Sequence, residues 1–133
     1  MTDRHAILTP DAPQPAPVYS QGVRQAGLVQ VSGQGPQDPV TGEYVHQGDI
    51  RAQTTRTLTN VLGILRAGGL GMDDVIMVRV YITKQSDFAA MNEAYGAFMA
   101  AHCATGILPA RTTLVVGLPR PEMLVEIDAL AVG

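Results

Sequence analysis

"DIRAQTTRTLTNVLGILRAGG", residues 49–69, decides the fold, because its hydrophobic period differs from that of the segments on either side. Its buried-type residues recur at intervals of three and four, which predicts one face of a helix. Asp49 is a suitable N-cap, and Gly68 with Gly69 predicts the end of the helix. The residues that form the predicted buried face are Ile50, Thr54, Thr57, Leu58, Val61, Leu62 and Leu65.

The segments before this helix indicate an extended lead-in and then a hairpin. Residues 9–17, "TPDAPQPAP", are too rich in proline for a helix or a central strand, so we interpret residues 1–17 as an extended lead-in. Residues 19–34 predict two strands with a turn at Gln25-Ala26-Gly27. Turn-forming residues then fill the surface loop at 35–45.

The segments after the helix predict a strand, a second helix and two more strands. "VIMVRVYIT" (75–83) alternates, so Ile76, Val78, Val80 and Ile82 are expected to share one face of a strand, and Met77, Arg79 and Tyr81 the other. Residues 86–102 predict a helix with Ser86 as its N-cap, on which Phe88, Met91, Tyr95, Phe98 and His102 form one stripe. Residues 111–117 and 123–132 predict the last two strands, separated by "LPRPE".

The resulting order, β-β-α-β-α-β-β, predicts an α+β domain with a mixed sheet and both helices on one face. The strands are apolar on both sides, so the open face of the sheet needs cover. Another copy of the chain is the simplest cover.

The composition of the chain limits the classes of partner that it is expected to have. Its 133 residues fit a single domain over 1–133, and 12 acidic against 9 basic residues give a net charge of -3. That balance argues against a nucleic-acid partner. A single cysteine, together with the lack of an apolar run that resembles a membrane span or signal peptide, predicts a cytoplasmic protein without a membrane partner. The three histidines lack metal-ligand spacing, so we expect no metal.

Polar residues at the last two strands are candidates for chemistry. Glu126 and Asp128 point the same way from an otherwise apolar strand, and Arg111 and Thr113 begin the strand before it. If these two strands paired as antiparallel neighbours, Glu126 would approach Arg111. One interpretation is a structural ion pair. The other is a site in which Arg111 clamps the carboxylate of a small acid and Glu126 orients or deprotonates water.

Several motifs together resemble the reactive-intermediate deaminase (RidA, or YjgF) family over nearly the whole chain after about residue 17. They are "YSQGV" (19–23), "SGQ" (32–34), "AQTTRTLTNVLGILRAGG" (52–69), "DFAAMNEAYGAF" (87–98), "PARTT" (109–113) and "VEIDALAV" (125–132). The resemblance implies a chorismate-mutase-like homotrimer with sites between subunits. It also implies hydrolysis of 2-imino acids, such as 2-iminopropanoate or 2-iminobutanoate, to 2-oxo acids and ammonia without a cofactor.

The resemblance assigns roles residue by residue. Arg111 matches the carboxylate-binding arginine, Glu126 the glutamate of the hydrolytic water, and Tyr19 a tyrosine of the pocket wall. Ser32 and Gly33 match the loop that approaches the ligand, and Asn92 matches an asparagine near the cleft.

Two departures from the family pattern bear on activity. Thr113 stands where many active members have cysteine, and the 103–110 loop is longer than the common form. The residues also leave open a non-catalytic sensor of 2-oxo acids. A ribonuclease and a pericyclic enzyme of the chorismate-mutase type are weaker alternatives.

Overall fold

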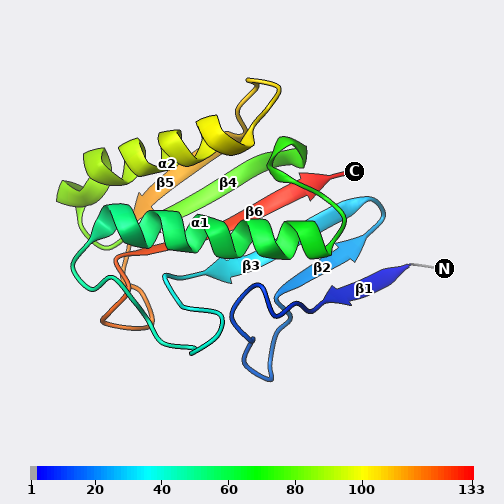
Figure 1. Ribbon diagram of the computed structural model, residues 1–133, viewed down its shortest axis with the longest axis horizontal. Helices are drawn as coiled ribbons and strands as arrows, with labels where there is room; N and C mark the ends of the chain where they lie inside the picture. Colours follow the sequence, from blue (N-terminus) through cyan, green and yellow to red (C-terminus); the bar gives the residue numbers. More distant parts are fainter. Residues whose placement is uncertain (1–2) are drawn as a thin grey trace.

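The computed structural model describes residues 3–133 as a six-stranded sheet with two α-helices packed on one of its faces (Figure 1). The order of strands is β1-β2-β3-β6-β4-β5, and only β4 and β5 run parallel. The elements are β1 (Arg4–Ile7), β2 (Gly22–Gln25), β3 (Leu28–Gln34), α1 (Ile50–Ala67), β4 (Val75–Ile82), α2 (Phe88–His102), β5 (Ala110–Val115) and β6 (Val125–Val132), with short 3₁₀ turns at Met72–Asp74 and Gln85–Asp87.

The predicted α+β architecture is confirmed, with one additional strand. β1 lies within the predicted lead-in and pairs with β2 at the edge of the sheet. Its sequence, "RHAI", is mostly exposed and has no hydrophobic alternation, so only its pairing with β2 makes it a strand. Residues 9–17 contain no helix or strand, as predicted.

Local capping signals fix α1 and the first hairpin as predicted. The Asp49 carboxylate accepts a hydrogen bond from the Ala52 amide at 3.0 Å, and Gly68 caps the other end. Between β2 and β3, Ala26 and Gly27 have φ of 52° and 78°. Positive φ at both central residues is what a two-residue hairpin turn requires.

Two details of the predicted faces and caps are wrong. Ile76 is 51% exposed, while Val75 is buried, because the pairing of β4 with β6 shifts register between Val75 and Met77. Such a bulge inserts one residue and reverses the side-chain alternation. At α2 the N-cap is Asp87 instead of Ser86, and it makes no capping hydrogen bond because a 3₁₀ turn leads into the helix.

β6 occupies the centre of the sheet, between β3 and β4. Alternate residues of β6, from Val125 to Ala131, are fully buried beneath the helices, so Glu126 and Asp128 share the opposite face as predicted. The hypothetical pairing of β5 with β6 is wrong, because β5 lies beside β4 in parallel. A connection through α2 returns the chain in the same direction, so β4 and β5 become parallel neighbours.

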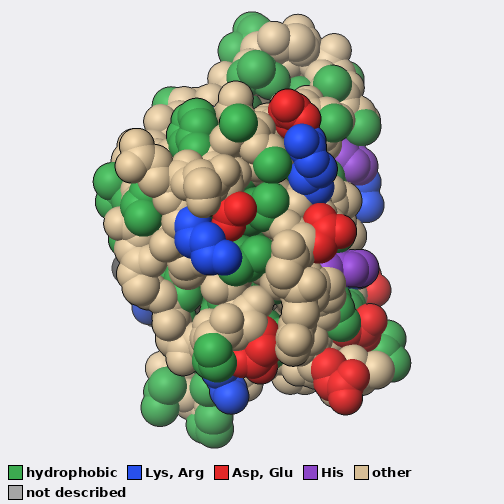
Figure 2. All heavy atoms as spheres, turned by 90° about the vertical axis from the view of Figure 1, so that its left-hand side faces the viewer, with side chains coloured by type: hydrophobic (Ala, Val, Ile, Leu, Met, Phe, Trp, Pro, Cys, Tyr) green, Lys and Arg blue, Asp and Glu red, His purple; other side chains and the backbone are tan. Residues whose placement is uncertain are grey.

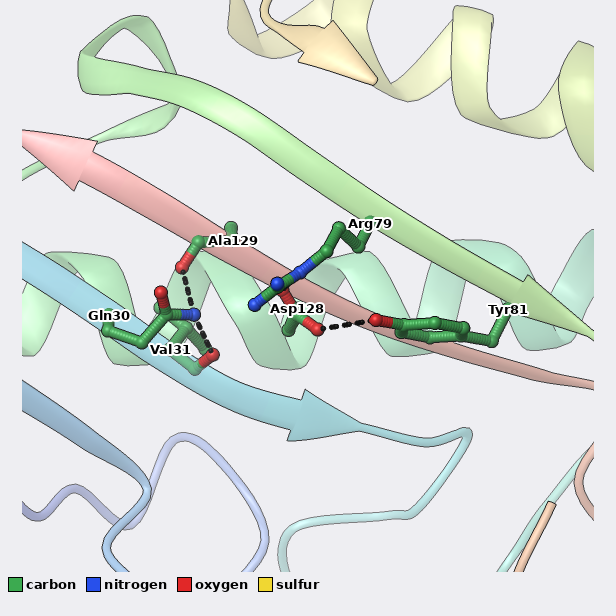
Figure 3. Close-up of polar contacts among 6 residues, drawn as sticks. All are labelled: Gln30, Val31, Arg79, Tyr81, Asp128 and Ala129. Atoms are coloured by element: carbon green, nitrogen blue, oxygen red, sulfur yellow. Dashed lines mark hydrogen bonds and ion pairs between the residues drawn. The ribbon is translucent and has the colours of Figure 1, made fainter. Parts of the chain in front are cut away.

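The sheet face opposite the helices carries polar side chains of the central strands (Figure 3). Arg79 on β4 forms an ion pair of 2.8 Å with Asp128 on β6, and the Tyr81 hydroxyl donates to the same carboxylate at 3.4 Å. Gln30 on β3 donates to the Val31 and Ala129 carbonyls at 2.9 and 3.0 Å. Both helices lie behind this face, and no helix or strand among residues 3–133 packs over it.

Candidate functional site

Glu126 lies in a polar cavity where β3 ends and β6 begins. Its neighbours Val125 and Ile127 are buried under the helices, so the Glu126 side chain projects to the opposite side. The cavity has a volume of about 320 Å³. Burial raises the pKa of the Glu126 carboxyl, and the nearby Asp128 charge raises it further. Other residues that line this cavity are Tyr19, Gly33, Tyr44, Arg120 and Met123.

Gly33 is the residue that allows Glu126 to lie where it does. A Cβ atom at this position would stand 2.9 Å from the Glu126 carboxyl carbon and closer still to one of its oxygens. The β3 backbone therefore forms the floor on which the carboxylate rests. The sequence motif "SGQ" contains the glycine at the one place where a side chain would displace the carboxylate.

Of the two predicted residues Tyr19 and Ser32, Tyr19 lines this cavity and Ser32 does not. Tyr19 lines it and is 53% exposed. The Ser32 hydroxyl donates to the Ser20 carbonyl at 2.6 Å, so it fixes the Tyr19 segment to β3. Ser32 lines a separate, shallower cavity, so the structure does not bring its side chain to Glu126.

The proline-rich segment contributes a wall of the cavity instead of being a simple lead-in. Pro13 and Pro15 line it, and the buried side chain of Gln21 holds the segment in place. Gln21 donates to the Thr9 and Pro13 carbonyls at 3.0 and 2.9 Å. Its side-chain oxygen accepts from the Thr9 amide at 2.7 Å. These bonds satisfy backbone groups that have no partner in the sheet.

Arg111 lies in a second cavity, of about 330 Å³, between β5 and α2. Its guanidinium carbon stands 4.7 Å from the ring centre of Tyr95 and 5.9 Å from that of Phe88. Among residues 3–133, no ion pair or hydrogen bond engages the guanidinium. The two rings therefore support a cation whose hydrogen-bond donors remain available. Asn92, Met99, Leu108 and Pro109 also line this cavity.

Two buried hydroxyls lie on the same side of the sheet as Arg111. Thr113 follows Arg111 by two residues on β5, and its hydroxyl is buried without a hydrogen-bond partner in the described part of the chain. The Tyr95 hydroxyl is also buried without a hydrogen-bond partner in this part of the chain. Burial raises the pKa of Tyr95, although the Arg111 charge opposes the shift, so Tyr95 remains a neutral donor.

Arg111 and Glu126 project from opposite faces of the sheet. Arg111 stands beside Val78, which is buried under the helices, whereas Glu126 stands beside Tyr81 on the open face. The interpretation as a structural ion pair is therefore wrong. Within a single copy the predicted residues line two separate cavities: Glu126, Tyr19 and Gly33 line one, and Arg111 and Asn92 line the other.

Sequence reasoning missed the roles of four residues at or beside these cavities. Tyr95 and Phe88 are seven residues apart on α2, so the helical period that assigned them to the core also places them together under Arg111. Tyr44 and Arg120 come from loops, where no periodic pattern exists. From the sequence, Pro119-Arg120-Pro121 indicates only a link between strands.

Neither metal ligands nor a membrane span stand out in the structure. Within residues 3–133, no group of three or more His, Cys, Asp or Glu side chains has the arrangement of a metal site. No α-helix in the same range combines the length and apolarity that crossing a membrane requires. Over the end of the molecule at the left of Figure 1, basic and acidic side chains are interspersed with apolar ones (Figure 2).

Comparisons with known proteins agree on one family. The family model described as Endoribonuclease L-PSP matches residues 9–133. A RutC family protein of Pyrococcus horikoshii is 39% identical over 128 residues, which cover 96% of this chain and 97% of that protein. A 2-iminobutanoate/2-iminopropanoate deaminase of Salmonella typhimurium is 38% identical over 126 residues, 95% of each chain. The crystal structure of Escherichia coli TdcF with bound serine is 36% identical with a TM-score of 0.89, and the match covers 97% of this chain and 98% of that one.

Proposed function

The chain belongs to the reactive-intermediate deaminase (RidA, or YjgF) family, and we propose that it hydrolyses 2-imino acids to 2-oxo acids and ammonia. The observation that carries this proposal is the uncommitted Arg111 guanidinium, which lines a cavity and has no acidic partner among residues 3–133. A guanidinium in that state binds a carboxylate through two parallel hydrogen bonds. Every 2-imino acid offers such a carboxylate next to its C=N carbon.

We propose that the working site forms between copies of the chain, in a homotrimer. Arg111 of one copy then meets Glu126 of the next, because the two groups project from opposite faces of a single sheet. The open face of the sheet, which carries Arg79 and Asp128, supplies the surface on which a second copy packs. Tyr19 and Gly33 line the Glu126 half, and Asn92 lines the Arg111 half.

The proposed reaction needs only positioning and one proton carrier. Arg111 holds the substrate carboxylate and so fixes the C=N carbon. Glu126 accepts a proton from water as the water oxygen bonds to that carbon. The same carboxyl then returns that proton to the imine nitrogen, which gives a carbinolamine. Glu126 next takes the proton of the carbinolamine hydroxyl and passes it to the nitrogen, so that the C–N bond breaks and ammonia leaves as the C=O bond forms. Burial raises the pKa of Glu126, which suits a group that must both accept and return a proton.

The test is hydrolysis of 2-iminopropanoate, generated from D-alanine by a D-amino-acid oxidase and trapped with semicarbazide. Wild-type protein should suppress semicarbazone formation. Arg111→Ala should hydrolyse the imine about 10²-fold or more slowly, because the contact that holds the substrate carboxylate in the transition state is missing. Arg66→Ala is the matched control, since Arg66 is an exposed arginine in the last turn of α1. Equal activity of Arg111→Ala and Arg66→Ala would reject the proposal.

A second candidate function is a non-catalytic binder of small carboxylates. The structure of Escherichia coli TdcF with bound serine favours carboxylate binding in this family without requiring turnover. Glu126→Gln separates the two functions. A binder keeps its affinity for 2-oxobutanoate in this variant, whereas an enzyme loses turnover while retaining much of that affinity because Arg111 is intact.

Cleavage of RNA, which the description of the family model suggests, has little support in this chain. The net charge is -3, and the face in Figure 2 mixes both signs of charge. Binding to RNA depends on neutralising phosphates with lysine and arginine and therefore weakens steeply with salt. A salt titration with single-stranded RNA tests this alternative directly.

A further inference from the structure

The Glu126 cavity contains a cation that the proposed reaction does not use. Arg120 lines this cavity and, among residues 3–133, its guanidinium takes part in no ion pair or hydrogen bond. Of the residues in the described range that line the cavity, Arg120 alone is basic. The amides of Gln21 and Gln37, which also line the cavity, are already committed to backbone carbonyls. Arg120 therefore supplies charged donors that face the cavity without a partner.

The backbone around Arg120 holds this cation in place although its side chain is exposed. Pro119 and Pro121 restrict the chain on both sides, and the Arg120 carbonyl accepts from the Met123 amide at 3.1 Å. The guanidinium carbon lies 5.8 Å from the ring centre of Tyr44. Burial raises the pKa of Tyr44, and the Arg120 charge opposes that shift. An aromatic ring beneath a guanidinium leaves its edge free to bind an anion.

The Glu126 cavity joins the proposed proton carrier to this second cation. Its lining includes Glu126, Arg120 and Tyr44, and its volume in a single copy is about 320 Å³. A ligand in this cavity can therefore lie between the Glu126 carboxyl and the Arg120 guanidinium.

We propose that Arg120, supported by Tyr44, forms a second carboxylate subsite, so that the preferred substrates are 2-imino dicarboxylic acids such as 2-iminobutanedioate and 2-iminopentanedioate. This inference rests on the proposed deaminase function. The neighbour's Arg111 holds the carboxylate next to the C=N carbon, and Arg120 holds the carboxylate at the far end. Water adds and ammonia leaves as before, and the side-chain carboxylate is unchanged.

Acidic groups near the subsite limit how the ligand lies. Glu122 and Glu126 are both near enough to raise the pKa of Tyr44, although burial is the larger cause. Neither glutamate forms an ion pair with Arg120 in the described residues. In the proposed arrangement the distal carboxylate contacts Arg120 from the cavity side, and the C=N carbon is directed toward Glu126.

The test compares two imines of matched length. A D-aspartate oxidase makes 2-iminopentanedioate from D-glutamate, and a D-amino-acid oxidase makes 2-iminohexanoate from D-norleucine. We expect wild-type protein to favour the dicarboxylic imine in kcat/KM by about tenfold or more, because a charged hydrogen bond is gained. Arg120→Ala should bring the ratio of the two kcat/KM values to about one. Arg120→Lys should keep part of the preference, and Arg66→Ala should leave the ratio unchanged. Equal kcat/KM for the two imines in wild-type protein would overturn the subsite.

Binding of the stable 2-oxo acids separates failure of the subsite from failure of the deaminase function. By calorimetry, wild-type protein should bind 2-oxopentanedioate at least about tenfold more tightly than 2-oxohexanoate, and Arg120→Ala should bind both equally. If neither imine is hydrolysed but this preference exists and depends on Arg120, the deaminase function is wrong and the subsite stands. If both imines are hydrolysed but neither assay shows a preference, the deaminase function stands and the subsite is wrong.

Discussion

Substitution of Gly33 by alanine should remove activity while it leaves the fold intact. The new Cβ would stand 2.9 Å from the Glu126 carboxyl carbon and 3.3 Å from its Cγ. Ordinary contact between carbon atoms is about 3.5–4.0 Å, so the carboxyl group must move by roughly 0.6–1 Å. A misplacement of about 1 Å at a reacting group costs on the order of 10²-fold in rate. We therefore expect Gly33→Ala to lower kcat/KM for 2-iminopropanoate about 10²-fold.

The structure also predicts that stability survives this substitution. The atoms nearest to the new Cβ belong to the end of a flexible side chain, and the φ of Gly33 is outside the left-handed region. Alanine at such a site changes the free energy of unfolding by no more than about 1 kcal/mol. Gly117→Ala is the matched control, since a Cβ there meets no atom within 4 Å. Urea unfolding and the semicarbazone assay on both variants test the reasoning, and full activity of Gly33→Ala would refute it.

Three further predictions concern stability. Burial raises the pKa of Glu126, so the contribution of this group to stability is fully present below the ordinary glutamate pKa and is lost as pH rises through the raised value. Glu126→Gln should therefore unfold at higher urea than wild type at pH 7 and at the same urea near pH 4, and a gap independent of pH would contradict this. Asp49→Ala removes the α1 cap on the Ala52 amide and should cost about 0.5–2 kcal/mol in urea unfolding, with Asp49→Asn close to wild type. Gln53→Met leaves the Leu124 amide and the Glu122 carbonyl without their 2.8 Å partner and should cost about 2–4 kcal/mol; unchanged urea unfolding would show that these groups find other partners.

Local signals in the sequence predict the elements of the fold well. The helical period and the Asp49 cap define α1, and the alternation in β6 identifies both its core face and the opposite direction of Glu126. Register shifts escape such reasoning, because the bulge that exposes Ile76 depends on the partner strand. β1 escapes it for the same reason, since four mostly exposed residues become a strand only by pairing at the sheet edge.

For the candidate site, too, local sequence identifies the residues, whereas long-range contacts decide where they lie. Residue type and the family motifs single out Arg111 and Glu126, but their separation depends on the order of the strands. Strand order is set by contacts between distant segments, here by β4 lying between β5 and β6. Arg120 lies in a loop without periodicity, so only its position beside Tyr44 and the cavity distinguishes it from a solvated surface charge.

Mixing two inactive variants tests most directly whether Arg111 and Glu126 act from different copies. Arg111→Ala and Glu126→Gln are unfolded together in equal amounts and refolded, so that copies assemble at random. If each site takes one group from each of two neighbours, roughly a quarter of the sites in a cyclic assembly regain both groups. We predict recovery of about that share of wild-type 2-iminopropanoate hydrolysis. Activity that stays at the level of the separate variants would contradict a shared site.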